Sequence, residues 1–145
     1  MAAQKEITLS TQLDKLETYA PSPDGNWLVR TTLSSNMSVR PMSGGAWRNL
    51  VSGTTGLWWQ TVVSPDSKWV FYHTLDQAGK DSLFRVSIAG GEPERMGDFP
   101  CESFSGLLNM SSEGRQILAT CNGGREGNAG YDLWVLENFV PLAKK

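Results

Sequence analysis

An internal repeat with a period of about 40–50 residues constrains this chain more than any other feature. Residues 22–29 (SPDGNWLV) recur as residues 64–71 (SPDSKWVF), and a weaker copy lies at residues 111–118 (SSEGRQIL). A second common element follows each copy, at residues 37–40 (MSVR), 83–86 (LFRV) and 133–136 (LWVL). Such a period is typical either of four-stranded sheet units or of paired helices in an array.

The chemistry of the turns favours sheets. Each copy is a short run of β-forming residues bounded by turn residues, which indicates a hairpin. In the Ser-Pro-Asp-Gly turn, proline presets φ, aspartate bonds nearby backbone N–H groups, and glycine takes the left-handed conformation. Only residues 12–19 could form a helical turn or two, and a polar strand fits them equally well. The sequence therefore predicts an all-β chain.

Each unit is expected to hold four antiparallel strands. The expected strands are 17–21, 27–32, 37–42 and 47–51, then 58–63, 69–74, 82–88 and 92–96, then 106–110, 116–121 and 131–136. The third unit has no convincing fourth strand. We expect a single domain of residues 1–145: an N-terminal strand and lead-in (1–16), three units (17–57, 58–104 and 105–139) and a tail (140–145).

These motifs resemble the Pro-Asp, WD-like repeat of TolB-like β-propellers. The resemblance rests on residues 22–25 and 64–67, Asp-Leu-Trp at 132–134 and Gly-Gly-Glu-Pro at 90–93, and it spans about residues 17–139. It implies four-stranded blades, usually six, that form a binding platform without catalytic residues. The chain departs from the repeat at Ser67, where glycine is expected, at Ser82, which stands where the third unit has Asp132, and in the third turn.

Three blades make half of a six-bladed ring, and half a ring leaves faces and strand edges uncovered. Residues 6–10 (EITLS) alternate polar and apolar side chains and have no hairpin partner in their own unit. We therefore expect a homodimer in which each N-terminal strand completes the last blade of the other copy, so that no edge stays bare. The alternative is that the chain is part of a longer single-chain propeller.

Aligning the inner strands places a few polar and aromatic side chains near the expected central channel. These candidate ligand-binding residues are Glu17, Trp59, Gln60, Glu102 and Asn109. The carboxylates of Glu17 and Glu102, doubled by a two-fold axis, could hold Ca²⁺ or another divalent cation. That would suit a metal-dependent hydrolase of the lactonase, phosphotriesterase or esterase type. This alternative function rests on analogy of fold alone. The leading interpretation is a binding or assembly scaffold whose ligand or protein partner occupies the channel or the rim loops.

His73 is the only histidine and hence a weak candidate for a catalytic base. Its place in the middle of a strand favours a packed, hydrogen-bonded side chain. The paired tryptophans at 58–59 favour packing between sheets over stacking on a sugar or base. Residues 122–130 lack the ending of a phosphate-binding loop and indicate a long hairpin loop. Structural roles are expected for the turn aspartates, the repeated tryptophans and the paired glycines: Asp24, Asp66, Trp27, Trp69, Trp134, Gly44, Gly45, Gly90 and Gly91.

Composition narrows the partners and the location. The chain has 13 basic and 15 acidic residues and no basic patch, which argues against a nucleic-acid surface. No apolar run approaches the length of a membrane helix, and residues 1–13 do not form a secretory signal. A cytoplasmic location is expected, or a periplasmic one if the chain comes from a longer exported protein. Cys101 and Cys121 could pair, although two buried free thiols are favoured.

Overall fold

The computed structural model describes residues 17–32, 36–53, 60–75, 77–99, 104–123 and 130–137, which form eleven strands. The first sheet comprises β1 (Glu17–Pro21), β2 (Trp27–Thr32), β3 (Asn36–Pro41) and β4 (Arg48–Val51). The second sheet comprises β5 (Thr61–Val63), β6 (Trp69–Leu75), β7 (Asp81–Ser87) and β8 (Glu94–Asp98). The third sheet comprises β9 (Phe104–Met110), β10 (Gln116–Gly123) and β11 (Gly130–Glu137).

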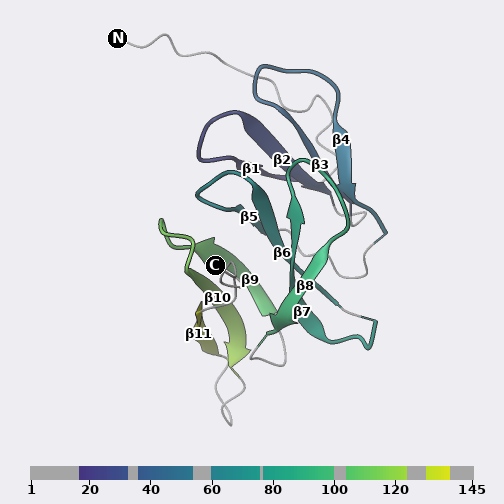
Figure 1. Cartoon of the computed structure of the whole chain (residues 1–145). Coiled ribbons are helices and arrows are strands. Elements are labelled where there is room, and N and C mark those ends of the chain that lie inside the picture. The colour runs from purple at the N-terminus through teal and green to yellow at the C-terminus, as the bar shows by residue number, and fades with distance from the viewer. Residues whose placement is uncertain are drawn as a thin grey trace, which may run out of the picture.

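Strands within each sheet follow chain order, and all neighbours are antiparallel. The three sheets lie one after another along the molecule (Figure 1), and the inner strand β5 contacts both β1 and β9. This arrangement confirms the all-β expectation, with several strand ends shifted by a residue or two. The strand expected at 58–63 begins at Thr61, and residues 58–59 lie outside the described residues. In the part of the chain that the structure describes, no helix is long and apolar enough to cross a membrane.

The repeated turns owe their shape to their serine and aspartate side chains. Ser22 Oγ donates to Asp24 Oδ1 at 2.5 Å and accepts from the N–H of Trp27 at 2.9 Å. Ser64 repeats both contacts, with Asp66 at 2.5 Å and with the N–H of Trp69 at 3.0 Å. Each aspartate also accepts a hydrogen bond from a backbone N–H of its own turn, Asp24 from Asn26 and Asp66 from Lys68, and such local contacts are what a structural role requires.

Ser67 shows why the second turn departs from the glycine pattern. Its φ is 58°, a left-handed conformation that costs an L-residue energy and that Gly25 adopts without that cost in the first turn. The Ser67 hydroxyl accepts a 3.1 Å hydrogen bond from the N–H of Asp24, which lies in the neighbouring sheet. The serine thus adopts a strained backbone conformation, and its hydroxyl links the turns of two neighbouring sheets.

Left-handed backbone also explains the paired glycines. Gly44 and Gly45 have φ values of 107° and 117°, and Gly90 and Gly91 have values of 103° and 117°. Residues with a side chain are strained in this conformation, so glycine is favoured at all four positions. A Cβ on Gly90 would also lie 3.0 Å from a guanidinium nitrogen of Arg48, whose other terminal nitrogen donates to the carbonyl of Ile88.

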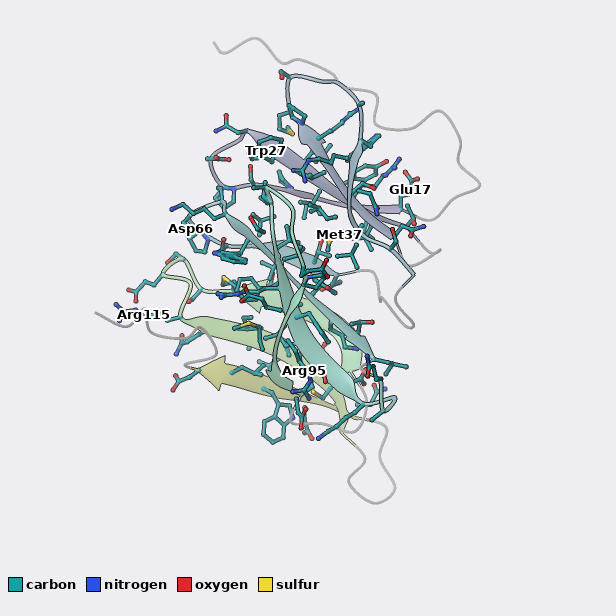
Figure 2. All side chains as sticks on the ribbon, turned by 45° about the vertical axis from the view of Figure 1, so that its right-hand side comes forward. Glu17, Trp27, Met37, Asp66, Arg95 and Arg115 are labelled. Carbon is teal, nitrogen blue, oxygen red and sulfur yellow. The ribbon has the colours of Figure 1, made fainter. Side chains whose placement is uncertain are left out.

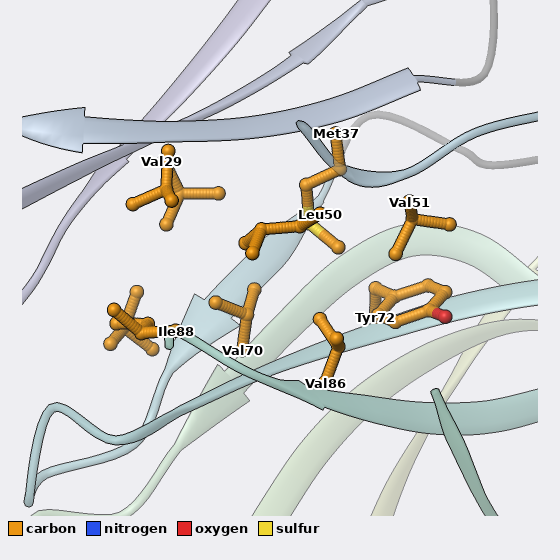
Figure 3. Packing of buried hydrophobic residues seen from close by; sticks show 10 residues of the cluster. Val29, Met37, Leu50, Val51, Val70, Tyr72, Val86 and Ile88 are labelled. Carbon is orange, nitrogen blue, oxygen red and sulfur yellow. The ribbon is translucent and has the colours of Figure 1, made fainter. Parts of the chain in front are cut away.

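The sheets pack face to face through two apolar clusters. In the first cluster, Val29 and Met37 of the first sheet meet Val70 and Val86 of the second (Figure 3).

We call the side of a sheet that meets the next sheet along the chain its forward face, and the opposite side its rear face. The second cluster joins the forward face of the second sheet to the rear face of the third: Phe71, Leu83, Phe99, Leu108, Ile117 and Ala119.

The three repeated tryptophans differ in their surroundings. Trp27 packs against the first cluster and Trp69 against the second, as expected. The prediction that Trp134 is a core residue was wrong, because 40% of its surface is exposed. Trp134 lies on β11, opposite Ala119 of β10. β11 is the outermost described strand of its sheet, which has three described strands where the other sheets have four. Trp134 therefore keeps its position in the repeat, but no described strand lies on the outer side of β11.

The expectation of free thiols was also wrong for Cys121. This residue is fully buried and disulfide-bonded. Strand pairing gives the reason: Cys121 lies opposite Phe104, the first residue of β9, and the other cysteine of the chain comes shortly before that strand in the sequence. Cys101 itself lies outside the described residues.

Candidate functional site: the inner strands and the two free faces

The inner strands carry the polar residues that the sequence assigned to a channel. Glu17 opens β1, Gln60 directly precedes β5, and Asn109 lies near the end of β9. The turn residues Asp66 and Arg115 lie on one side of the molecule and Glu17 on the other (Figure 2). Glu17 and Asn109 therefore stand at different ends of their strands and do not form one cluster. Trp59 and Glu102 lie outside the described residues.

Two of these polar side chains already have structural partners. Glu17 Oε2 accepts a 2.5 Å hydrogen bond from the Tyr19 hydroxyl, and Glu17 Oε1 lies 3.8 Å from Arg30 Nη1. The side-chain oxygen of Gln60 accepts a 2.8 Å hydrogen bond from the N–H of Leu108 in the third sheet. Gln60 thus joins two sheets. Asn109 is exposed on the forward face of the third sheet.

The expected cation site depends on residues that the structure brings together only in part. Across the described ranges, no three His, Cys, Asp or Glu side chains lie close enough to share a metal ion. Glu17 is engaged with Tyr19 and Arg30, and its suggested co-ligand Glu102 falls in a range that is not described. The metal-dependent hydrolase stays a prediction that no described contact supports.

His73 is a buried structural residue of β6. Its side chain is 1% exposed, and its Nε2 lies 2.7 Å from Asp81 Oδ1. The edge of its ring meets Phe99, with ring centroids 5.5 Å apart. Burial lowers the pKa of His73, and the hydrogen bond and charge of Asp81 offset only part of that effect. The expected packed, hydrogen-bonded histidine is confirmed, and this histidine is neutral near pH 7.

The rear face of the first sheet is where the structure gathers the most unusual side chains. The guanidinium carbon of Arg30 lies 4.3 Å from the centroid of the Trp47 ring, and that of Arg40 lies 4.7 Å from it. Tyr19 extends this group, with its ring centroid 6.2 Å from that of Trp47. Two cations thus share one indole ring, an arrangement that the negative face of the ring stabilises. We call Arg30, Arg40 and Trp47 the arginine–tryptophan cluster.

Charge in the arginine–tryptophan cluster is only half balanced. Among the described residues, Glu17 is the single carboxylate with a contact to this cluster, through Arg30. Within the described residues, Arg40 has no acidic partner, and the Nε atoms of both arginines are buried without a hydrogen-bond acceptor. Burial raises the pKa of Tyr19, and its hydrogen bond to Glu17 raises it further. The tyrosine therefore stays neutral, so it leaves the excess positive charge uncompensated.

The forward face of the third sheet has the opposite character. Leu133 and Val135 project from β11 with exposed fractions of 64% and 53%. Glu137 ends β11 and is exposed, and its Oε1 accepts a 2.6 Å hydrogen bond from Gln116. These three side chains lie on the same side of the strand because strand positions alternate between faces. The two ends of the stack therefore present one cationic face and one apolar, acidic face.

Sequence reasoning missed the arginine–tryptophan cluster. The available signal was the repeat itself, because Arg30 and Arg40 occupy positions that hold Tyr72 and Val86 in the second unit. An arginine at a position where the neighbouring unit has a buried apolar residue indicates a different kind of interface. The pairing of both arginines with Trp47 depends on the course of the chain before β4, which the motif does not specify.

Comparison with known proteins rests on structure alone. No protein-family model and no curated protein sequence matches the chain. A protein assigned as TolB from Agrobacterium tumefaciens superposes with a TM-score of 0.69 at 15% identity, over 90% of this chain and 48% of its own. TolB from Acinetobacter baumannii gives a TM-score of 0.64 at 18% identity, over 85% of this chain and 30% of its own.

A third similar structure comes from a different setting. The β-propeller domain of the Trilobed protease from Pyrococcus furiosus, which has an open velcro topology, gives a TM-score of 0.60 at 10% identity. The alignment covers 85% of this chain and 39% of that domain. The chain thus spans about half, or less, of the length of the structures that it resembles. The three stacked sheets are propeller blades, and the chain has a β-propeller fold similar to that of TolB.

Proposed function

We propose that this chain is a binding and assembly scaffold that associates with a second copy of itself to form a closed six-bladed ring. The observation that carries the proposal is the stack of three blades, which spans 48% of a similar TolB structure and has no further sheet at either end among the described residues. In a ring, the inner strands β1, β5 and β9 of both copies would surround a channel. A protein or small-molecule partner would bind in that channel or on the rim loops.

The third blade supports the way in which the ring closes. It has three described strands where the other two have four, so the outer edge of β11 has no neighbouring strand among the described residues. Such an edge offers backbone N–H and C=O groups to any extended segment. Residues 6–10, which lie outside the described residues, alternate polar and apolar side chains and suit this role. The N-terminal strand of each copy would become the fourth strand of the other copy's last blade.

The disulfide at Cys121 supports an extracytoplasmic location. Disulfides persist in oxidising compartments and are rare in the cytoplasm. Cys121 is also fully buried, which shields its own sulfur from thiols in solution. If free thiols are blocked with a labelled alkylating reagent during lysis and the purified protein is then denatured, we expect no labelled cysteine. Two labelled cysteines per chain would contradict the assignment.

The mass of the isolated chain in solution tests the assembly. Light scattering should give twice the 15.9 kDa chain mass, and a lasting folded monomer would refute the proposal. Deleting residues 1–10 should dissociate the ring. A matched pair refines this test: Ile7→Asp places a charge on the apolar side of the N-terminal strand and should weaken association, whereas Thr8→Asp on the other side should not. Equal effects would argue against a paired strand.

A further inference from the structure

Strand register assigns each position of the first blade a counterpart in the second. Arg30 lies opposite Tyr19 on β1, as Tyr72 lies opposite Thr61 on β5. In the same way Arg40, opposite Leu28, corresponds to Val86, which lies opposite Val70. Arg30 and Arg40 therefore occupy the places of two residues that are buried against the preceding blade.

The same register applies to the third blade. Leu133 lies opposite Thr120 on β10 and corresponds to Met37 of the first blade. Val135 corresponds to Val39, and Glu137 corresponds to Pro41. The exposed leucine and valine thus hold positions that are 0% exposed in the first blade, where the second blade covers them.

The interface between the first two blades shows how such faces fit together. Met37 and Val39 of the forward face share one cluster with Tyr72 and Val86 of the rear face. If the forward face of a third blade met the rear face of a first blade in the same way, Leu133 and Val135 would lie against the arginine–tryptophan cluster. Glu137, next on the same side of β11, would then lie beside Arg40.

Charge agrees with this placement. The rear face of the first blade has two guanidinium groups and one carboxylate contact, and Arg40 is the cation left without an acidic partner among the described residues. The forward face of the third blade offers an exposed carboxylate at Glu137, whose second oxygen forms none of the hydrogen bonds found in the described structure. Complementary charges at an interface steer association and exclude wrong pairings.

We infer that Arg40 of one copy pairs with Glu137 of a second copy, while Leu133 and Val135 of that copy cover Arg30 and Trp47. The inference rests on the proposed ring and specifies the contact that closes it. Because a two-fold ring has two such contacts, each copy contributes one arginine and one glutamate. The partner that this face recognises is thus another copy of the chain.

Charge reversal tests the pairing. Arg40→Glu and Glu137→Arg should each weaken self-association by at least about tenfold per interface, a modest change for a partly buried charge pair. Because the ring has two such interfaces, the dissociation constant should rise about a hundredfold. An equimolar mixture of the two variants should dimerise again, because both contacts in the mixed ring then pair opposite charges. The variant with both changes should also dimerise. Arg115→Glu makes the same charge change in an exposed turn and should leave the affinity unchanged.

The possible outcomes distinguish failure of the Arg40–Glu137 contact from failure of the proposed ring. A monomeric wild-type chain refutes the ring itself. A dimeric wild type whose two single variants dimerise as tightly as before leaves the ring standing and overturns the Arg40–Glu137 contact. Two monomeric variants that stay apart when mixed also overturn it, provided that circular dichroism shows both to be folded. Sedimentation velocity across a concentration series provides the dissociation constants.

Discussion

Truncating two leucines at corresponding positions should have different effects on stability, because one lies in the core of the stack and the other at its exposed end. Leu83 on β7 and Leu133 on β11 both lie on forward faces, opposite His73 and Thr120 respectively. Leu83 is 1% exposed because the third blade covers it, whereas Leu133 is 64% exposed. The residue type and the register position are the same, and two things differ: the third blade covers Leu83, and β8 lies beside β7, whereas β11 has no outer neighbour among the described strands.

The expected magnitudes follow from that difference in exposure. Leu83→Ala removes buried methyl groups and should lower the free energy of unfolding by about 2–5 kcal/mol. Leu133→Ala should change the stability of the dissociated chain by less than about 0.5 kcal/mol. In the ring a second copy would bury the exposed two thirds of Leu133, a gain of about 1–2 kcal/mol out of the roughly 1.5–3 kcal/mol for full burial. Leu133→Ala should therefore become costly only when the chain associates.

Urea unfolding followed by tryptophan fluorescence, at protein concentrations well below and well above the dissociation constant, measures both effects. The midpoint for Leu83→Ala should fall at both concentrations, and that for Leu133→Ala only at the higher one. If Leu133→Ala were as costly as Leu83→Ala in the dissociated chain, the free forward face would not be free. A loss below about 1 kcal/mol for Leu83→Ala would contradict its core position.

Three further predictions concern the turns and the buried histidine. Asp66→Ala should lower stability by about 0.5–2 kcal/mol in thermal unfolding, because the bonds that Asp66 accepts from Ser64 and from the N–H of Lys68 are lost. Ser67→Ala keeps the strained φ but loses the acceptor for Asp24, and should cost about 0.5–1.5 kcal/mol, whereas Ser67→Gly should be nearer neutral because it also relieves the strain. The pKa of His73 is lowered in the folded state, so the unfolded chain binds its proton first and stability should fall as the pH drops below about 6.5. His73→Asn should flatten that slope in denaturant titrations, and an unchanged slope would contradict it.

Most of the fold could be predicted because the repeat contains its own turn chemistry. The Ser-Pro-Asp motif predicted hairpins at Asp24 and Asp66, and the same side chains form those turns in the structure. Trp134 shows where such reasoning stops. A repeated position identifies a residue as part of a blade, but its burial depends on whether another strand or blade lies over it. The state of Cys121 likewise followed from which strand pairs with β10, which is a property of register.

The candidate site was less predictable. Glu17 and Gln60 were chosen for their place near the inner strands, and both make contacts within or between blades. Sequence position indicates which strand a polar residue occupies, but not which neighbour satisfies it. Arg30 and Arg40 passed unnoticed because an arginine in a strand is ordinary by itself. Only the register, which matches them to Tyr72 and Val86, shows that they replace buried residues.

The difference between forward and rear faces gives the stack a direction, and a directional building block can polymerise. In the proposed ring each end of a blade stack would meet the opposite end of another copy, so two copies would close only if three blades together turned the chain by half a revolution. A small error in the rotation between blades would leave a gap, and the open ends would add further copies into a helical fibre. The contacts between neighbouring blades, such as the hydrogen bond from Asp24 to Ser67, would therefore help to set the angle between one blade and the next. Loosening them would favour filaments over rings before it unfolded any single blade.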